Sequence, residues 1–211
     1  MKPFIISVDG PAASGKGKIA KYISKKWKLK HLDSGMLYRR LAYILIRDNV
    51  NTKNPKEIQV KLNKLNGISF RNNKYLRSQA VSKASSQIAV HSIVRLFINR
   101  VQNSFVNENL EYNRFVIDGR DIGSVVFKNA NIKLYIDVEP EIRAKRRYKQ
   151  LIDSGEKSIY PKILKEIELR DQKDKYRKNS PLVIPEDAYI INNNGTFKNT
   201  VKQIRQIIKL I

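Results

Sequence analysis

The stretch FIISVDGPAASGKGK, residues 4–18, decides the fold. Its first five residues form an apolar run that predicts a short buried strand. The chain then breaks into a loop with the spacing G-x-x-x-x-G-K, from Gly10 to Lys16. A helical pattern of apolar residues follows to about Trp27. Strand, glycine-rich loop and helix in this order predict a phosphate-binding loop.

The residue types in this loop suit the binding of nucleotide phosphates. Glycines at positions 10, 15 and 17 permit backbone angles that turn consecutive N–H groups inward. The helix that begins near Gly15 adds the positive end of its dipole, and Lys16 adds a charge for the outer phosphates. A serine or threonine usually follows that lysine and helps to hold Mg²⁺, whereas Gly17 and Lys18 follow it here. The alternative is an ordinary glycine-rich turn between a strand and a helix.

The composition fits one α/β domain with an inserted lobe. The chain has 211 residues, of which 41% are hydrophobic, and it contains no cysteine. Disulfides and cysteine metal sites are therefore excluded. No apolar run approaches the length of a membrane span, and a strand that starts at residue 4 is expected to leave no room for a signal peptide. We expect a cytoplasmic enzyme.

The formal net charge of +23 has two interpretations. One is a general bias in composition combined with an anionic substrate, and the other is the binding of a polyanion such as a nucleic acid. The lysines are scattered along the whole chain, and neither a basic tail nor a recognisable nucleic-acid module is present. The scatter favours the first interpretation.

Beyond the loop, short apolar runs alternate with helical patterns. Strands are predicted at about 29–32, 114–117, 132–136 and 188–191. Helices are predicted after residue 35, from 55, and over about 78–90, 92–107, 139–153, 162–177 and 196–211. A small hairpin is expected at 68–76, around Arg71-Asn72-Asn73. This alternation predicts a parallel sheet with helices on both faces.

Three helices carry expectations about their faces. The helix after residue 35 should bury Tyr38, Leu41, Ala42, Leu45 and Ile46. The helix 92–107 should bury the stripe Ile93, Leu96, Phe97, Val101 and Phe105. The helix 162–177 has few apolar residues, which predicts a mobile, solvated arm.

Polar residues at the strand ends are candidates for chemistry. Asp118 ends an apolar strand, where P-loop proteins place an acid that holds the water shell of Mg²⁺, although a turn aspartate is the alternative. Asp118, Arg120 and Asp121 together offer a metal carboxylate and a phosphate clamp. Arg39 follows Asp33-Ser34-Gly35 at helical reach and either binds a second phosphate or lies at the surface.

The predicted arm carries Arg170, Asp174 and Arg177 on one helix face, at spacings i, i+4 and i+7. Arg170 and Asp174 form either a surface ion pair or part of a lid. A lid would swing arginines onto the transferring phosphoryl group, where charge neutralisation and positioning supply most of the rate. It would also exclude water from the reaction.

Five motifs, in order along nearly the whole chain, resemble bacterial-type cytidylate kinase. They are GPAASGKGK at 10–18, HLDSGMLYR at 31–39, VIDGRDIGSVVF at 116–127, AKRRYKQL at 144–151 and LRDQKDKYRKNSPL at 169–182. The last of them separates this family from other P-loop kinases. The resemblance implies ATP-dependent phosphorylation of CMP and dCMP, with Mg²⁺, by an enzyme that is a monomer.

The resemblance also implies an architecture. We expect a single P-loop kinase domain over residues 1–211, an α/β fold with a parallel five-stranded sheet flanked by helices. A monophosphate-binding lobe is expected at about 55–107 and a helical lid at about 150–180.

Residue roles carry over by position. The implied ATP-binding residues are Gly10, Pro11, Ala12, Ala13, Ser14, Gly15, Lys16, Gly17 and Lys18, and the implied catalytic residues are Lys16, Arg120, Arg170 and Arg177. The implied substrate-binding residues are Ser34, Arg39, Ser86, Arg95, Arg120, Asp121, Asp174 and Arg177. Within this set Asp121 matches a residue that binds the sugar hydroxyls. Asp118 is implied to anchor Mg²⁺ through water.

Three features depart from the family pattern. Lys18 stands in place of the usual threonine, and either contacts phosphate by its charge or points to solvent. Lys173 and Lys175 stand where the lid usually has arginines, and lysine lacks the bidentate fork. The hairpin at 68–76 is shorter than the usual lobe insert. Two other functions therefore stay open: a P-loop kinase for a different acceptor, and a nucleotide-switched nucleic-acid-binding protein.

Overall fold

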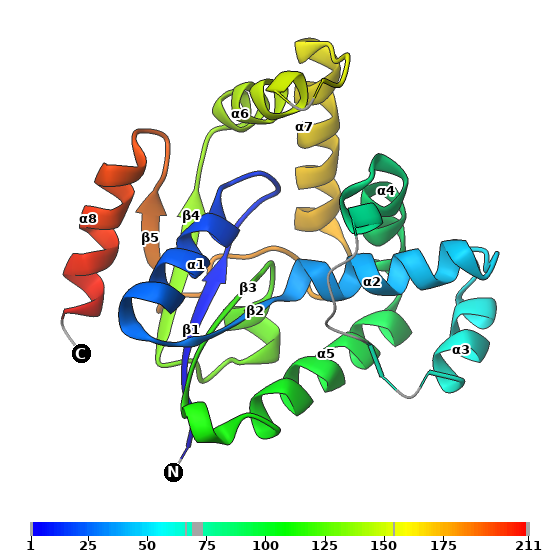
Figure 1. Cartoon of the computed structure of the whole chain (residues 1–211), viewed down its shortest axis with the longest axis horizontal. Coiled ribbons are helices and arrows are strands. Elements are labelled where there is room, and N and C mark those ends of the chain that lie inside the picture. The colour runs from blue at the N-terminus through cyan, green and yellow to red at the C-terminus, as the bar shows by residue number, and fades with distance from the viewer. Residues whose placement is uncertain (1, 66, 69–73, 154, 210–211) are drawn as a thin grey trace. The chain divides into compact units, whose positions relative to one another are not determined.

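The computed structural model describes residues 2–65, 67–68, 74–153 and 155–209. Strands and helices alternate along much of the chain (Figure 1). The strands are β1 (Phe4–Asp9), β2 (Lys30–Asp33), β3 (Arg114–Gly119), β4 (Ile132–Asp137) and β5 (Tyr189–Asn192). The α-helices are α1 (Lys16–Trp27), α2 (Ser34–Arg47), α3 (Pro55–Asn63), α4 (Gln79–Ile88), α5 (Ser92–Asn107), α6 (Pro140–Asp153), α7 (Tyr160–Tyr176) and α8 (Phe197–Ile208).

The chain divides into two compact units. The sheet unit comprises Lys2–His31 and Arg114–Ile211, and the helical unit comprises Leu32–Asn113. Strand β2 lies where the first part of the sheet unit leads into the helical unit.

The five strands form one sheet in the order β2-β3-β1-β4-β5. Strand β1 pairs in parallel with β3 and with β4, and β4 pairs in parallel with β5. Val8 faces Asp118, and Asp9 faces Gly119. The glycine-rich loop after β1 and the segment after β3 therefore start next to each other at the carboxyl edge of the sheet, where ligands bind in open α/β folds. The predicted parallel five-stranded sheet is confirmed.

Helices α1 and α8 share one hydrophobic core with the strands. Helix α1 contributes Ile19, Ala20 and Ile23, all fully buried, at the spacing that places them on one face. Helix α8 contributes Ile204 and Ile208 and lies beside β5. Because this core clamps α1 onto the sheet, the loop between β1 and α1 is fixed at both ends.

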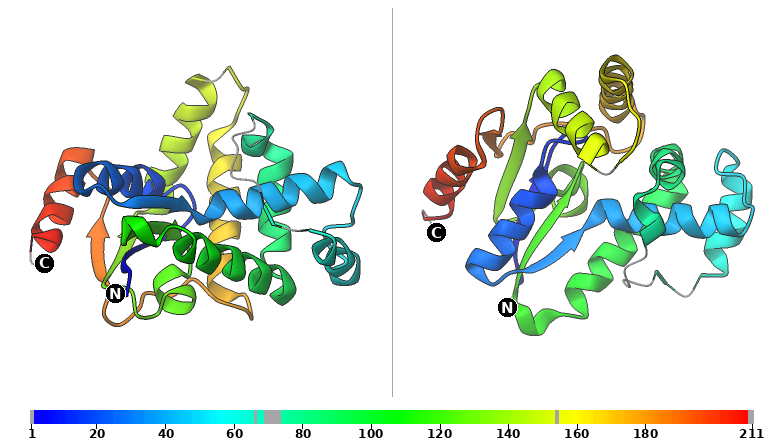
Figure 2. Two further views of the ribbon diagram at one scale, coloured as in Figure 1. Left: turned by 60° about the horizontal axis from the view of Figure 1, so that its bottom comes forward. Right: turned by 45° about the horizontal axis from the view of Figure 1, so that its top comes forward.

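Helices α6 and α7 form a pair that lies side by side in each view of Figure 2. Ala144 of α6 packs with Ile163 and Ile167 of α7, and these three residues are buried. The expectation that this arm is solvated throughout is therefore wrong: three buried side chains join α7 to α6. The remaining side chains of α7 are largely exposed, as its polar composition predicts.

Side chains cap the starts of helices α2, α3 and α4 in the helical unit. The Asp33 side chain accepts a hydrogen bond from the Met36 N–H at the start of α2, and Asn54 and Ser78 cap α3 and α4 in the same way. The predicted positions of α3, α4 and α5 match the structure within two or three residues.

Two predicted helix faces need correction. In α5 the buried side chains are Val94, Arg95, Ile98, Gln102 and Val106. The predicted stripe lies next to this face, and its Leu96 is 58% exposed. In α2, Ile46 is exposed and Arg40 is buried. In both helices the buried face includes a charged or polar residue, which a purely hydrophobic pattern passes over.

The hairpin predicted at 68–76 falls partly on residues 69–73, which lie outside the described residues. The prediction that the second strand of the hairpin includes residues 74–76 is wrong, because Lys74–Arg77 form a 3₁₀ turn. Leu76 in this turn is buried and anchors it within the helical unit.

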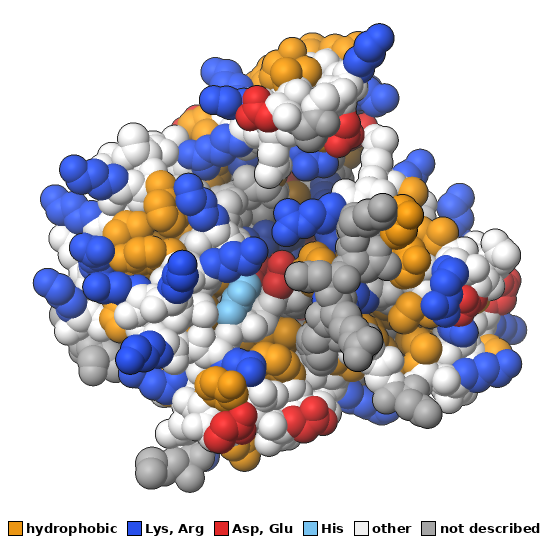
Figure 3. Space-filling model, viewed as in Figure 1, with side chains coloured by type: hydrophobic (Ala, Val, Ile, Leu, Met, Phe, Trp, Pro, Cys, Tyr) orange, Lys and Arg blue, Asp and Glu red, His pale blue; other side chains and the backbone are white. Residues whose placement is uncertain are grey.

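Lys and Arg side chains are spread over the face shown in Figure 3, with acidic and hydrophobic side chains between them. This spread fits the interpretation of the +23 charge as a general property of the composition. Within the described part of the chain, every helix is too short or too polar to cross a membrane.

Candidate active site

The loop between β1 and α1 requires glycine at two positions. A side chain at Gly10 would place its Cβ 2.6 Å from the Ile136 carbonyl oxygen, which is backbone and cannot move aside. Gly15 has a φ of +83°, a left-handed conformation that suits glycine, and it precedes the first turn of α1. The loop thus follows β1 closely and ends at a helix N-terminus, where unpaired N–H groups and the helix dipole attract anions.

Gly17 differs from its predicted role in the backbone of the loop, and Lys18 has a neighbour that the sequence did not indicate. Gly17 has no left-handed backbone and belongs to α1, so the prediction that its freedom shapes the loop is wrong. A Cβ there would lie 3.6 Å from Asp118 Oδ2, which shows how closely that carboxylate approaches the helix. The Lys18 ammonium lies over the Phe197 ring, 4.1 Å from its centroid. In this structure Lys18 ties α1 to the start of α8.

Lys16 is half-buried at the first position of α1, and its Nζ donates to the Pro11 carbonyl at 3.0 Å. Burial and, to a smaller extent, the nearby positive charge of Arg120 together lower the pKa of Lys16 to about 7, while Asp118 acts in the opposite direction. The loop therefore holds a cation that lacks a full counter-charge. Phosphate oxygens are the groups that would supply this charge.

We expect ATP to bind more weakly as the pH rises above about 7. The pKa of Lys16 in the empty loop is about 7, whereas bound phosphates favour the protonated ammonium. Binding therefore takes up a proton above that pH, and the affinity falls by at most about tenfold per pH unit. Calorimetric titrations at pH 8 in two buffers of different ionisation enthalpy measure this uptake. The guanidinium of Lys16→Arg does not titrate in this range. If this variant takes up as many protons on binding ATP as the wild type does, a group other than Lys16 takes up the proton.

Asp118 is buried at the end of β3, beside the loop. Its Oδ1 lies 2.6 Å from Nε2 of His31, and its Oδ2 faces Gly17. One oxygen is thus held by the protein and the other is directed to the start of α1. This arrangement suits a carboxylate that orients water around a phosphate-bound cation.

Asp9 joins the loop to the segment after β3. It is 2% exposed, and its two carboxylate oxygens accept hydrogen bonds from the N–H groups of Ile122 and Gly123, at 2.9 and 2.8 Å. Burial raises the pKa of Asp9 to about 7 in spite of these two bonds. Asp9 directly precedes Gly10. It thereby fixes the backbone after Arg120 and Asp121 next to the glycine-rich loop.

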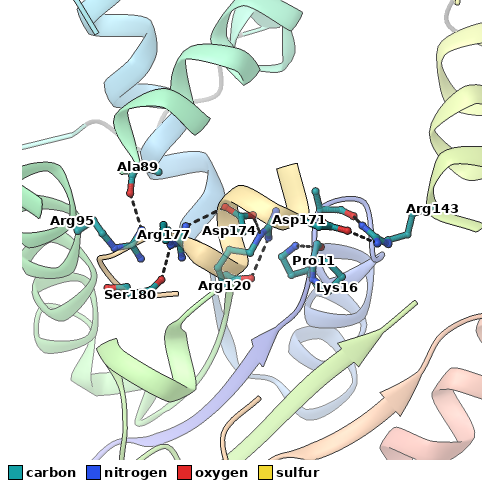
Figure 4. A network of polar contacts seen from close by, with 12 residues as sticks. Pro11, Lys16, Ala89, Arg95, Arg120, Arg143, Asp171, Asp174, Arg177 and Ser180 are labelled. Atoms are coloured by element: carbon teal, nitrogen blue, oxygen red, sulfur yellow. Dashed lines mark hydrogen bonds and ion pairs between the residues drawn. The ribbon is translucent and has the colours of Figure 1, made fainter. Parts of the chain in front are cut away.

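Asp174 lies between two arginines at the end of α7 (Figure 4). Its Oδ2 accepts from Arg120 Nε at 2.9 Å, and its Oδ1 accepts from Arg177 Nη1 at 3.2 Å. Burial alone would raise the pKa of Asp174, but the charges of Arg120, Arg170 and Arg177 outweigh it and hold the pKa below its usual value. The structure therefore brings together the sequence-predicted residues 120, 174 and 177, and keeps the carboxylate ionised.

A second connection joins α7 to the loop. Arg143 of α6 is 2% exposed and donates to the carbonyls of Val138 and Ala12, at 2.9 and 3.1 Å. Its Nη2 donates to Asp171 of α7 (Figure 4). Arg143 thus contacts the glycine-rich loop and the predicted lid at the same time, so any movement of α7 must change its contacts.

The helical unit holds four of the predicted site residues. Ser34 is buried at the start of α2. Arg39 donates to the Leu76 carbonyl at 3.0 Å and to Ser82 Oγ at 3.1 Å. The latter is one turn before Ser86 on α4, which is half-buried.

Arg95 is the second arginine of this unit that the sequence marks. It is 4% exposed, donates to the Ala89 carbonyl at 3.1 Å, and lies 5.7 Å from the centroid of the Tyr38 ring. Because Tyr38 and Arg39 are neighbours on α2, the two arginines approach the same part of the helical unit. Arg39 donates to two acceptors within the helical unit, which argues against the alternative that it is an ordinary surface arginine.

Comparison with known proteins identifies the family. The family model for cytidylate kinase matches residues 6–210. The chain belongs to the cytidylate kinase family. The cytidylate kinase of Bartonella tribocorum is 37% identical over 100% of this chain and 98% of its own length. That of Rickettsia felis is 40% identical over 98% of this chain and 92% of its own length.

A solved structure supports the fold alone. The crystal structure of TT1252 from Thermus thermophilus superimposes with a TM-score of 0.53 and 14% identity, over 100% of this chain and 99% of that one. Together with the cytidylate kinase motifs on the parallel sheet, this establishes an α/β P-loop kinase fold.

Sequence reasoning missed four residues of this cytidylate kinase: Asp9, His31, Arg143 and Asn193. Asp9 is the last residue of β1, and Asn193 directly follows β5. Their places at strand ends are the signal that could have marked them. His31 stands inside a quoted motif, and Arg143 begins an arginine-rich turn, but neither pattern indicates a partner. Each one acts by contacts to residues far away in the sequence.

Proposed function

We propose that the chain transfers the γ-phosphoryl group of ATP to CMP or dCMP, giving ADP and CDP or dCDP. The observation that carries this proposal is the match to cytidylate kinase over residues 6–210, on a chain that also presents a P-loop lysine beside an acid and an arginine at the end of β3. Relatives that match over nearly the full length of both chains support the same reaction. The two alternative functions are not favoured.

The reaction needs little covalent help from the protein. A phosphate oxygen of the CMP dianion attacks the γ-phosphorus of ATP in line with the leaving ADP, and no strong general base is required. Lys16 and the arginines at 120, 170 and 177 share the charge of the transferring group. Residues 10–18 hold the ATP phosphates by backbone N–H groups and by the Lys16 ammonium.

Mg²⁺ fits the residues at the loop. Bound to ATP, the ion neutralises phosphate charge. Asp118 has one oxygen held by His31 and one directed to the start of α1, where the phosphates bind. We assign Asp118 to the water shell of the ion, because Gly17, which follows Lys16, has no hydroxyl that could hold it.

The acceptor residues are those that the cytidylate kinase motifs mark. We assign Ser34, Arg39, Ser86, Arg95, Arg120, Asp121, Asp174 and Arg177 to CMP. Asp121 is buried directly after Arg120 and would accept from the sugar hydroxyls. Arginines suit this site because their planar forks match phosphate oxygens in pairs.

We also propose that residues 1–211 work as one P-loop kinase domain. Its monophosphate-binding lobe is at about 55–107 and its lid is at about 150–180, a range that holds the whole of α7 and the arginines at 170 and 177. The proposed enzyme is a cytoplasmic monomer whose partners are ATP and CMP or dCMP, with no nucleic acid. Sedimentation of the purified protein, with and without both nucleotides, tests the monomer.

An acceptor panel tests the function. We expect purified protein with ATP and Mg²⁺ to form ADP fastest with CMP or dCMP, and at least about tenfold more slowly with AMP. Coupled detection of ADP measures each rate under the same conditions. No ADP with CMP, dCMP or UMP would contradict the proposal, and a preference for AMP or a non-nucleotide would favour a kinase for a different acceptor.

A further inference from the structure

Asn193 lies directly after β5, in the loop that leads to α8. It is 6% exposed, and its side-chain Nδ2 donates to the backbone carbonyl of Ser14 at 2.8 Å. Its Oδ1 accepts from Oγ1 of Thr200, at 2.6 Å. Thr200 is itself 1% exposed, on α8. Both ends of the Asn193 amide therefore have fixed partners in a buried setting.

The backbone of Asn193 is held as firmly as its side chain. Its N–H donates to the Asp137 carbonyl at the end of β4, at 2.9 Å. Its carbonyl accepts from Nη2 of Arg146 on α6, at 2.8 Å. Four hydrogen bonds, to the glycine-rich loop, α8, β4 and α6, thus orient a single residue, which is the kind of support that a positioned group needs.

Asn193 and Gly15 fit each other closely. A Cβ on Gly15 would lie 2.8 Å from Asn193 Nδ2, closer than real Cβ contacts allow. The glycine of the loop therefore makes room for this amide, in addition to adopting a φ of +83°. The space next to Gly15 is occupied by a hydrogen-bond donor that belongs to the far end of the chain.

The contact determines the direction of one peptide group. Ser14 and Gly15 share a peptide bond, and the described chain has no cis peptide. In a trans peptide the C=O and the N–H point in opposite directions. Because Asn193 binds the Ser14 carbonyl, the Gly15 N–H points away from Asn193. This N–H is one of the donors that a phosphate-binding loop offers to its ligand.

We infer that Asn193 is a positioning residue for the nucleotide: it holds the Ser14–Gly15 peptide so that the Gly15 N–H faces the phosphates of ATP or ADP. Without it, the peptide can rotate and direct the electronegative carbonyl at the phosphates. The inference rests on the proposed function for the identity of the donor nucleotide. It extends that function to a residue 179 positions away from Ser14 in the sequence.

Asn193→Ala tests the inference. We expect the Kd of ADP, measured by calorimetry, and the KM of ATP to rise about tenfold, because one phosphate donor is misdirected. The KM of CMP should stay within about twofold. A merely structural role would lower the active fraction and hence kcat, and would leave the Kd of ADP and both KM values unchanged. The matched control is Asn194→Ala, in the same loop, since Asn194 binds Glu139 and not the P-loop.

Thr200→Val provides a second variant that keeps the volume of the core. It removes the hydroxyl that holds Asn193 Oδ1, so we expect a smaller rise in the Kd of ADP, about two- to threefold. Combining both substitutions should weaken ADP binding no further than Asn193→Ala alone, because both act on one contact. If Asn193→Ala does not fold, Thr200→Val decides the question.

ADP binding separates this inference from the proposed function, because it requires no acceptor. If the wild type binds ADP but does not phosphorylate CMP, the proposed function fails and the role of Asn193 can still be measured. A wild-type Kd of ADP in folded Asn193→Ala and in Thr200→Val would overturn the inference.

Discussion

Lys16→Ala is expected to reduce kcat for phosphoryl transfer by about 10³-fold or more. The Lys16 ammonium is half-buried in the loop, and burial and Arg120 lower its pKa to about 7. Within the described part of the chain its Nζ donates one hydrogen bond, to the Pro11 carbonyl, and an ammonium has further donors for phosphate oxygens. The charge is therefore placed for a ligand and is most effective when negative charge develops on the transferring group.

The fold should tolerate this substitution. Removing a poorly compensated cation offsets the loss of one hydrogen bond, so the free energy of unfolding should change by about 1 kcal/mol or less. Rates of ADP formation with CMP and thermal unfolding followed by circular dichroism measure the two effects. Lys21→Ala is the matched control, because Lys21 is exposed on the same helix. Unchanged kcat in a natively folded Lys16→Ala would contradict our assignment of the loop.

The sheet and the loop could be predicted because their signals are local. The apolar run 4–8, the glycine spacing and the helix after it all lie within about twenty residues. The left-handed backbone of Gly15 belongs to the same short stretch. The groups that crowd Gly10 and Gly15, which are Ile136 and Asn193, lie far away in the sequence. Parallel strands present their carboxyl ends at one edge of the sheet. The motif at the end of β3 could therefore be expected to bring Asp118 and Arg120 beside the loop.

The polar contacts between distant segments could not be predicted from the sequence. Asp9 binds the N–H groups of Ile122 and Gly123, and Arg143 binds Ala12, at separations of more than a hundred residues. Nothing in the neighbourhood of either residue indicates its partner. The burial of Arg95 and Gln102 on α5 was not predicted either, and it displaced the apolar face expected there. A polar residue inside the core is stabilised by partners that only the folded chain supplies.

The proposed lid illustrates what could and what could not be predicted from the sequence. The spacing of Arg170, Asp174 and Arg177 predicted a common face, and the structure confirms that Asp174 and Arg177 are paired. The sequence did not indicate that Arg120, from the end of β3, completes the pairing at Asp174. The choice between a surface ion pair and a lid depends on such a partner, and a buried carboxylate shared by arginines from two elements favours a positioned lid.

Arg177→Ala is expected to lower kcat by about 10³-fold, in the range that a single arginine on a transferring phosphoryl group supplies. Arg177 ends the helix α7, where its Nε donates to the Ser180 carbonyl at 2.6 Å and its Nη1 donates to Asp174 at 3.2 Å. These contacts hold the guanidinium in place beside the carboxylate that also binds Arg120. A planar guanidinium fork matches phosphate oxygens in pairs.

The stability of this variant separates catalysis from structure. Loss of the Ser180 and Asp174 contacts should cost about 1–3 kcal/mol of unfolding free energy, since the ion pair is largely buried. A variant that stays folded at the assay temperature would still show the full loss in kcat. Lys175→Ala is the matched control, because Lys175 is exposed on the same turn and its ammonium lies over the Tyr176 ring. Arg177→Lys should recover only part of kcat, because lysine keeps the charge without the fork. If kcat of Arg177→Ala falls only in proportion to its folded fraction, Arg177 is a structural residue, and the charge on the phosphoryl group must be met by Arg120 and Arg170.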